Sequence, residues 1–467
     1  MSGGVTRSVL IDLTDIVVLL TLGGYWMICK KDKYGALNFL KKLDSMCLIQ
    51  NIWNALGGDQ TLLLQAIADL MKSCRSEIRP IPSRVTTYCR KLLKKKYQAS
   101  DVSPSTIANA IGTMLLLPSL PIEGGETGRA FFVFGDSLVD SGNNNYLPTT
   151  ARADTLPYGV DYPTHHPTGR FSNGFNLPDL ISQRIGSEAA LPYLSPEMRG
   201  QNLLLGANFA SAGVGILNDT GIQFEGILRI YQQFALFQQY QERLGFEVGA
   251  EEAERIVNGS LILITLGSND FVNNYFYPPN SARSLQFTIP KFCSYVISEY
   301  RKILMRLYEL GGRKVLVTGT GPLGCIPSQL AERSINGDCV SQIQEASQIF
   351  NQLLIKMTTE LNNQLTSPVF IVVNAFRINM EFINHPQRFG FVSSKIACCG
   401  QGRFNGIEGC TSFSSLCSNR DLYVFWDSFH PSQHAWEILA NYIFNGTTNY
   451  MSPMNLTTIL AMDSNFY

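Results

Sequence analysis

The sequence lacks an excess of charge of either sign: its 467 residues carry 37 Lys and Arg against 37 Asp and Glu. It also lacks low-complexity tracts and repeats of the kind that build solenoids. Nucleic-acid-binding proteins usually carry a basic excess, so we expect no nucleic-acid partner. Hydrophobic residues make up 45% of the chain and charged residues only 16%. This composition excludes a disordered chain and predicts a large buried core.

The basic residues are nevertheless unevenly placed, and the densest stretch covers 72–96. It holds nine Lys or Arg against a single Glu. Such a stretch can contact a membrane surface or nucleic acid, but it is more often the solvated face of a helix. We favour the solvated face and keep membrane contact through the N-terminal part as the alternative.

No apolar run reaches the roughly 20 residues that a membrane-spanning helix requires. The run at 16–29 (IVVLLTLGGYWMIC) has Asp12 and Asp15 upstream, where a signal peptide would carry positive charge. We therefore expect a buried helix there, with a membrane segment over 8–29 as the alternative. A second run at 107–121 (IANAIGTMLLLPSLP) has the character of a signal peptide placed inside the chain.

The 11 cysteines include no Cys-x-x-Cys pair, and no histidine stands at zinc-finger spacing, which argues against a structural zinc site. Three disulfides of a secreted protein explain six loop cysteines better. These are Cys325, Cys339, Cys398, Cys399, Cys410 and Cys417. Four glycosylation sequons, at Asn218, Asn258, Asn445 and Asn455, also favour the secretory pathway.

The pattern of the chain changes near residue 128. Residues 1–128 show helical patterns without a catalytic constellation, so we expect a mostly helical or poorly ordered extension. Residues 129–467 alternate short apolar runs with amphipathic segments. The runs are 131–134, 206–210, 261–266, 315–318 and 369–373, and the main amphipathic segments are 227–245, 290–310 and 340–365. This alternation predicts a mainly parallel sheet covered by helices on both faces.

Three of the predicted strands are followed by polar turns that contain Ser137, Gly213 and Asn269. The carboxyl ends of parallel strands meet at one edge of a sheet, where ligands bind. Ser137 is therefore a candidate nucleophile, and a helix beginning there would add the positive end of its dipole.

A serine nucleophile also needs a base, a group that orients the base, and donors for the oxyanion. His430 is the candidate base, and Asp427 can orient its imidazole from three positions earlier. The backbone N–H groups of Ser137 and Gly213 and the side-chain amide of Asn269 are the candidate oxyanion donors.

Three other histidines have simpler interpretations. His165 and His166 lie in a Pro/Thr/Gly loop and are expected at the surface. His434 follows His430 at the spacing of two metal ligands on a helix, but no third ligand is evident, so we place His434 on a helix surface. We expect no metal ion and no organic cofactor.

Taken together, these motifs resemble the plant GDSL esterase/lipase family of the SGNH hydrolase superfamily over residues 129–467. The resemblance lies in RAFFVFGDSLVDSGNNN (129–145), PTGRFSNG (167–174), GANFASAGVGILNDTG (206–221), ITLGSNDFVNNYF (264–276), GPLGCIP (321–327), ACCGQG (397–402) and FWDSFHPS (425–432). It implies a three-layer α/β/α, flavodoxin-like domain with a Ser137–His430–Asp427 triad. It also implies that Ser137, Gly213 and Asn269 form the oxyanion hole.

The resemblance further implies a secreted glycoprotein that hydrolyses carboxylic esters, often lipid esters, and whose loop cysteines form disulfides. We expect a monomer. The chain departs from the family in reading GSND at 267–270 where many relatives read GGND, and in the 128 residues before the first strand. A fused gene annotation and a membrane-tethering extension are both explanations of that N-terminal part.

Three other functions use the same residues. The triad could transfer an acyl group to an alcohol instead of water, or it could deacetylate a cell-wall polysaccharide. A non-catalytic binding protein on a hydrolase scaffold is the third alternative. The sequence argues against this last one, because every expected catalytic position is filled.

Overall fold

The computed structural model describes residues 129–407 and 409–464. The predicted extension 1–128 lies outside the described residues, together with its segments 8–29, 72–96 and 107–121. The predictions made for those segments therefore stay predictions.

In the described part of the chain, a six-stranded sheet runs in the order β2-β1-β3-β4-β5-β8. Its strands are β1 (Phe131–Gly135), β2 (Gly206–Asn208), β3 (Leu261–Thr265), β4 (Val315–Thr318), β5 (Phe370–Val373) and β8 (Met451–Ser452). The pairs from β2 to β5 are parallel, and β8 pairs antiparallel with β5. The parallel strands have the flavodoxin-like order, which confirms the predicted α/β fold.

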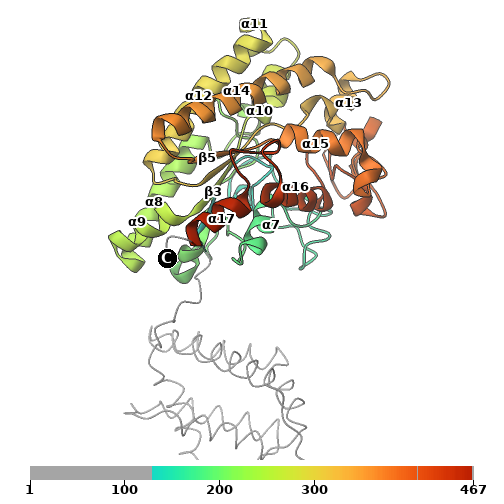
Figure 1. Ribbon diagram of the computed structural model, residues 1–467. Helices are drawn as coiled ribbons and strands as arrows, with labels where there is room; N and C mark the ends of the chain where they lie inside the picture. The colour runs from blue at the N-terminus through green and yellow to red at the C-terminus, as the bar shows by residue number, and fades with distance from the viewer. Residues whose placement is uncertain (1–128, 408, 465–467) are drawn as a thin grey trace, which may run out of the picture. The chain divides into compact units, whose positions relative to one another are not determined.

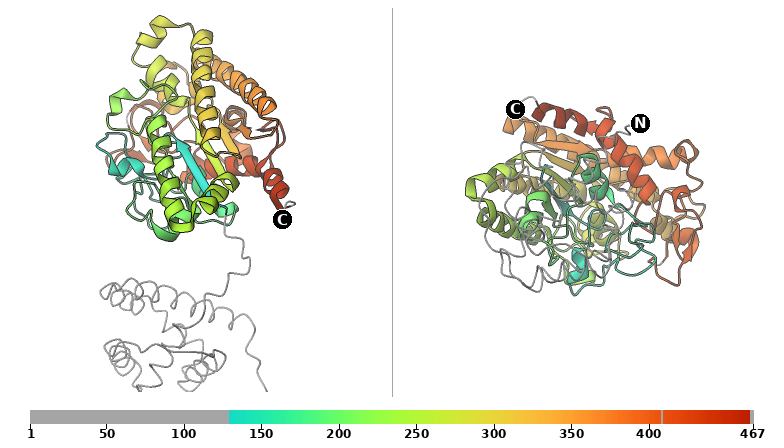
Figure 2. Two further views of the ribbon diagram at one scale, coloured as in Figure 1. Left: turned by 90° about the vertical axis from the view of Figure 1, so that its left-hand side faces the viewer. Right: turned by 90° about the horizontal axis from the view of Figure 1, so that it is seen from below.

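Helices cover both faces of this sheet. They are α7 (Leu177–Arg184), α8 (Ile230–Val248), α9 (Ala250–Gly259), α10 (Ser268–Asp270), α11 (Ala282–Gln286), α12 (Ile289–Glu309), α13 (Pro327–Arg333), α14 (Ser341–Leu365), α15 (Ala375–Asn384), α16 (Gln433–Asn445) and α17 (Leu456–Ser464). Figure 1 shows α12 and α14 on one side of the strands and α7, α16 and α17 on the other. The left panel of Figure 2 looks onto α8 and α12, with strands behind them.

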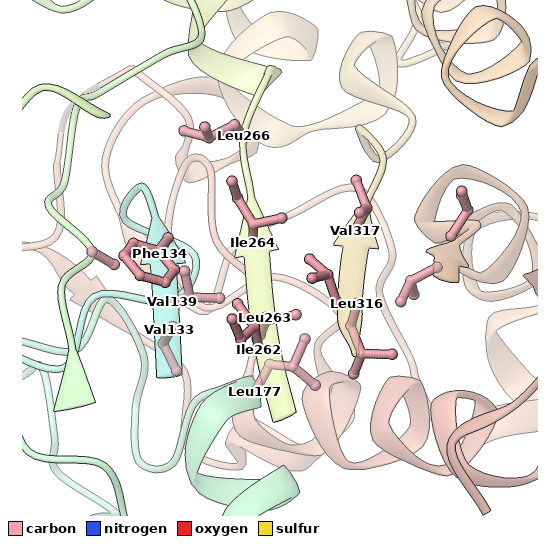
Figure 3. Close-up of a cluster of buried hydrophobic side chains, with 14 of the residues drawn as sticks. Val133, Phe134, Val139, Leu177, Ile262, Leu263, Ile264, Leu266, Leu316 and Val317 are labelled. Carbon is pink, nitrogen blue, oxygen red and sulfur yellow. The ribbon is translucent and has the colours of Figure 1, made fainter. Parts of the chain in front are cut away.

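The strands form because their side chains are apolar on both faces of the sheet. Every residue of β1 and β3 is buried, and Figure 3 shows Val133 and Phe134 beside Ile262, Leu263 and Ile264. A fully buried aliphatic or aromatic side chain contributes about 1.5–3 kcal/mol relative to an exposed one, so this double-sided burial fixes the centre of the fold.

Aromatic side chains pack α8 against the first strand, β1. Phe132 and Phe134 alternate with Val133 and therefore point to the same face of β1. On that face the ring of Phe237 lies 4.9 Å from the ring of Phe132 and 5.3 Å from that of Phe134, measured between centroids. The packing holds β1, and the turn that follows it, in one position.

Two local features refine the sequence analysis. No helix begins at Ser137, because residues 136–139 form a turn in which the Asp136 carbonyl accepts hydrogen bonds from the N–H groups of Val139 and Asp140. Strand β2 ends at Asn208, two residues before the end of the predicted strand 206–210, although the N–H groups of Phe209 and Ser211 still donate to the Val133 and Gly135 carbonyls of β1. The helix and strand bounds elsewhere differ from the expected ranges by a few residues at most.

The six loop cysteines that were predicted to form disulfides all do so. Within the described residues the disulfides join Cys325 to Cys339, Cys398 to Cys417, and Cys399 to Cys410. The last two enclose a small antiparallel sheet of β6 (Cys399–Gly400) and β7 (Ser415–Leu416) outside the main sheet. No helix of the described residues is long and apolar enough to cross a membrane.

Candidate active site

Ser137 lies on the turn at the carboxyl end of β1. Gly135 precedes it with a φ of +138°, and a Cβ there would stand 2.2 Å from the Thr265 carbonyl oxygen, so glycine is required for the close approach of β3. The Asp136 carboxylate accepts a hydrogen bond from the Leu138 N–H at 3.0 Å and fixes the turn. The side chain of Ser137 is consequently only half-buried and faces a cavity.

Asp427 and His430 lie on the loop that precedes α16. His430 Nε2 is 2.8 Å from Ser137 Oγ, and His430 Nδ1 is 2.8 Å from Asp427 Oδ1. Both side chains are nearly inaccessible to solvent. The structure therefore brings Ser137, His430 and Asp427 into one hydrogen-bonded row, although Ser137 is distant from the other two in sequence.

Asp427 stays ionised despite its burial. Burial by itself raises the pKa of the carboxyl, but the charge of His430 and hydrogen bonds from His430 and the backbone lower the pKa below its ordinary value. The carboxylate oxygen Oδ1 accepts the backbone N–H groups of Phe429 and His430, each at 2.8 Å. An ionised carboxylate is the state that can orient a neutral imidazole.

The other two predicted residues face the same cavity as Ser137. Gly213 has a φ of +89°, and a Cβ there would stand 2.6 Å from the ring of Phe224. Within the described residues, neither the Ser137 N–H nor the Gly213 N–H donates a hydrogen bond to another residue. Two backbone donors of residues that line the cavity are thus free.

The Asn269 side chain is held in one orientation. Its Nδ2 donates to the Val214 carbonyl at 2.9 Å, while its Oδ1 accepts from Asn273 Nδ2 at 2.7 Å. The same Nδ2 lies 3.5 Å from Asp136 Oδ2, and Asn269 lines the cavity. Asn273 comes from the short π-helix Phe271–Tyr275, and our sequence analysis did not single it out.

Two buried carboxylates shape the loop around Gly213. Asp140 accepts from the Ala212 N–H, and Asp270 accepts from the N–H groups of Ile216 and Leu217. Burial raises the pKa of each carboxyl to about 6, although hydrogen bonds from these backbone groups counter part of the effect. Asp140 belongs to the GDSLVDSGNNN motif, so its position in the sequence was a signal for this role that we did not use.

The cavity has a volume of about 420 Å³. Apolar side chains, including Phe171, Phe224, Val272, Leu323 and Phe429, form much of its wall. Clefts of this size with a few convergent polar groups are typical of small-molecule sites. The candidate nucleophile therefore opens onto a largely hydrophobic space.

The three histidines with simpler interpretations lie apart from this arrangement. His165 and His166 are exposed, as predicted. His434 lies on α16, where its ring packs against Phe391 and its Nδ1 is 3.5 Å from Glu437. Among the described residues, no group of three or more His, Cys, Asp or Glu side chains could hold a metal ion.

Comparisons with known proteins identify the family of the chain. Residues 131–443 match the family described as GDSL-like lipase/acylhydrolase. The chain belongs to this family. It is 59% identical to GDSL esterase/lipase At4g28780 of Arabidopsis thaliana over 360 residues, which cover 77% of this chain and 96% of the relative. It is 58% identical to GDSL esterase/lipase LTL1 of the same plant over 336 residues, 72% of this chain and 92% of that relative.

Family membership makes the protein a carboxylic ester hydrolase. The match to At4g28780 spans 360 residues, whereas the stretch 129–467 contains only 339. The similarity to that GDSL relative therefore reaches into the residues that precede 129.

Proposed function

We propose that the protein hydrolyses carboxylic esters through an acyl-enzyme formed on Ser137. The observation that carries this proposal is the hydrogen-bonded row from Ser137 Oγ through His430 to Asp427 at the wall of the cavity. A serine, a base in contact with it, and a carboxylate that orients the base are the parts that nucleophilic acyl transfer requires.

In the proposed first step, Ser137 Oγ attacks the ester carbonyl while His430 Nε2 takes its proton. The carbonyl oxygen becomes an oxyanion, and the C–O bond to the alcohol then breaks as His430 returns the proton to the leaving alcohol. In the second step, water attacks the acyl carbonyl by the same route and frees Ser137. Asp427 stabilises the imidazolium and remains ionised throughout.

We assign the stabilisation of the oxyanion to the N–H groups of Ser137 and Gly213 and to the Asn269 amide. The first two have no other hydrogen-bond acceptor in the described part of the chain, which supports the assignment. Donors fixed before the reaction stabilise the developing charge without having to reorganise.

The apolar cavity wall favours a lipid ester, because an acyl chain that enters it leaves water. Acyl transfer to an alcohol and deacetylation of a polysaccharide use the same triad and stay alternatives. Product analysis on lipid esters and on acetylated glycans distinguishes them, since only the transferase gives a new ester and only the deacetylase releases acetate from the glycan.

We also infer that the protein enters the secretory pathway. Disulfides form and persist in oxidising compartments, and three are present in the described residues. Among the sequons, Asn218 and Asn445 are exposed and accessible for glycosylation. Asn455 is half-buried and accepts the Thr458 N–H at the start of α17, so we expect it to remain unmodified. Asn258 is half-buried as well.

The first test is hydrolysis of p-nitrophenyl acetate, butyrate and palmitate by the full chain and its Ser137→Ala variant. We expect hydrolysis by the wild type and a loss of at least about 10⁴-fold in the variant, because no nucleophile remains. Thermal unfolding of the two proteins should coincide. Wild-type activity in Ser137→Ala would disprove the assignment.

A further inference from the structure

Tyr158 is a polar residue of the site that none of the sequence motifs marks. Its side chain is buried, and its ring packs edge-on against the rings of Phe171 and Trp426. Its hydroxyl donates a hydrogen bond of 2.8 Å to Asp427 Oδ2. The tyrosine reaches Asp427 from a segment 269 residues earlier in the chain.

The two oxygens of Asp427 are held in different ways. Oδ1 accepts backbone N–H groups of its own loop, from Phe429 and His430. Oδ2 lies 2.9 Å from His430 Nδ1, and Tyr158 is its other partner among the described residues. Tyr158 therefore makes the contact that ties the carboxylate to a part of the protein outside residues 427–430.

We propose that Tyr158 is a positioning residue of the catalytic triad, which holds the Asp427 carboxylate in line with His430 and shares its negative charge. The inference rests on the proposed function, because it needs His430 to act as the base. Tyr158 touches Asp427 and acts on the reaction through it.

The hydroxyl is a permanent donor in the neutral pH range. Burial, together with the neighbouring charge of Asp427, raises the pKa of Tyr158 well above its ordinary value. Without this donor, the full negative charge of Asp427 would act on His430. The imidazolium would then be stabilised in the resting enzyme, and a higher pH would be needed to free the base.

Other ionisable groups also surround His430. Asp427 contacts it directly and Tyr158 contacts Asp427, while Asp136 lies within electrostatic range of His430, and Asp270 lies within electrostatic range of Asp136. Burial raises the pKa of Asp136 to about 7, so ionisation of Asp136 can also contribute to the acid limb of the pH profile of kcat/KM. The test must therefore compare pH profiles between variants that leave Asp136 and Asp270 in place.

Tyr158→Phe removes the hydroxyl and keeps the ring that packs on Phe171 and Trp426. Tyr300→Phe is the matched control, because Tyr300 is fully buried and its hydroxyl has no hydrogen-bond partner in the described residues. Both variants are made in the full chain. The readouts are kcat and KM for p-nitrophenyl butyrate from pH 5 to 9 and the rate at which diethyl p-nitrophenyl phosphate labels Ser137.

In Tyr158→Phe we expect the acid limb of kcat/KM to move up by about one pH unit. On the plateau, kcat should fall about tenfold with KM nearly unchanged, because an interaction of the triad and not of the bound ester is lost. The labelling rate should fall in parallel. Tyr300→Phe should follow the wild type in all three readouts.

A second variant tests whether Tyr158 acts through Asp427. In an Asp427→Asn background, adding Tyr158→Phe should change kcat less than twofold, since two residues that act as a unit are not additive. A full tenfold further loss in that background would overturn the proposal. So would a Tyr158→Phe variant whose pH limb and plateau match the wild type, or one that loses activity and thermal stability without moving the limb.

The failure of this inference is distinguishable from failure of the proposed function. If the wild type neither hydrolyses the ester nor is labelled at Ser137, the triad itself is wrong and both proposals fall. If the wild type reacts normally and Tyr158→Phe does the same, only the positioning role is wrong.

Discussion

Ser137 and Gly213 lie on turns and Asn269 lies in the short helix α10, each after a buried strand of the main sheet, whereas Asp427 and His430 lie on a loop outside it. The first group, which we call the sheet half of the site, is fixed by the packing of β1 and β3. The second, which we call the loop half, depends on contacts brought from distant parts of the chain.

Hydrogen bonds and disulfides from distant segments hold the loop half. The N–H groups of Cys398 and Cys399 donate to the carbonyls of Phe425 and Trp426, directly before Asp427. Disulfides tie both cysteines to the Cys410–Cys417 stretch. Tyr158 adds its hydrogen bond to Asp427. We therefore expect that a change in the loop half can displace the base, His430, while Ser137 and the oxyanion donors keep their positions.

The largest expected effect comes from the loop half. His430→Ala should lower kcat by at least about 10⁴-fold, because Ser137 then has no base. Combining it with Ser137→Ala should cause little further loss, since the two residues act as a unit. Steady-state kinetics on p-nitrophenyl butyrate measure both variants. A double variant far less active than either single variant would mean that the two residues contribute independently.

The sheet half gives the next effect. Asn269→Ala removes one candidate oxyanion donor, and we expect kcat to fall about 10²–10³-fold with KM nearly unchanged. Asn273→Ala releases the Asn269 amide from its fixed orientation and should cost less, about tenfold, because the donor is still present. The order of the two kcat values checks the assignment. If Asn273→Ala were the more damaging, the amide of Asn273 itself would be the donor.

Local patterns in the sequence predicted which residues form each half. They also predicted that the sheet half lies at one edge of the sheet. Runs such as FFVF are buried on both faces and must be strands, and parallel strands bring the turns at Ser137, Gly213 and Asn269 to one edge. The residues Asp427 and His430 stand three apart, so their contact is local as well. The catalytic roles of these residues stay predictions until the variants are measured.

Contacts between distant segments could not be predicted. Six cysteines allow 15 pairings, and the nested pair Cys398–Cys417 and Cys399–Cys410 depends on the path of the loop. Tyr158 meets Asp427 across 269 positions, and no periodic pattern encodes such an encounter. The turn at Ser137 is also set by a side chain, since Asp136 accepts the Leu138 N–H there, a common alternative to helix for this residue type.

The disulfides offer a test of the loop half that leaves the triad residues unchanged. Replacing Cys399 and Cys410 by Ala should destabilise the fold by about 2–4 kcal/mol, as should the Cys325→Ala, Cys339→Ala control. Of the two pairs, only Cys399–Cys410 supports the stretch before Asp427 through the Cys399 N–H. The kcat of the variant that lacks Cys399 and Cys410 should therefore fall about tenfold further than that of the control. Denaturant unfolding and steady-state kinetics measure the two effects. Equal kcat values would show that the loop half keeps its geometry without this disulfide.

The last contrast, which has the smallest expected effect on the reaction, is between the pKa values of two buried carboxyls. They are Asp427 in the loop half and Asp136, which directly precedes Ser137 of the sheet half. In the loop half, the hydrogen-bond and charge partners of Asp427 outweigh its burial and lower its pKa. Ionised Asp427 therefore stabilises the fold at pH values above its unfolded pKa of about 4. This contribution is lost as the pH falls through the lower pKa of the folded protein. In the sheet half, burial dominates and raises the pKa of Asp136 to about 7. The folded protein then binds more protons than the unfolded chain between about pH 4 and pH 7, so Asp136 makes the fold less stable as the pH rises through this range.

Asp136→Asn removes this ionisation and keeps an oxygen that can accept the Leu138 N–H. A pKa difference of about three units corresponds to about 4 kcal/mol, which is the upper bound of the effect. Urea unfolding at pH 5 and pH 8 should therefore show that the wild type loses more stability between the two pH values than the variant does. If both lose the same amount, Asp136 is ionised in the folded protein at pH 5, and hydrogen bonding around Ser137 outweighs burial in the sheet half as it does around Asp427.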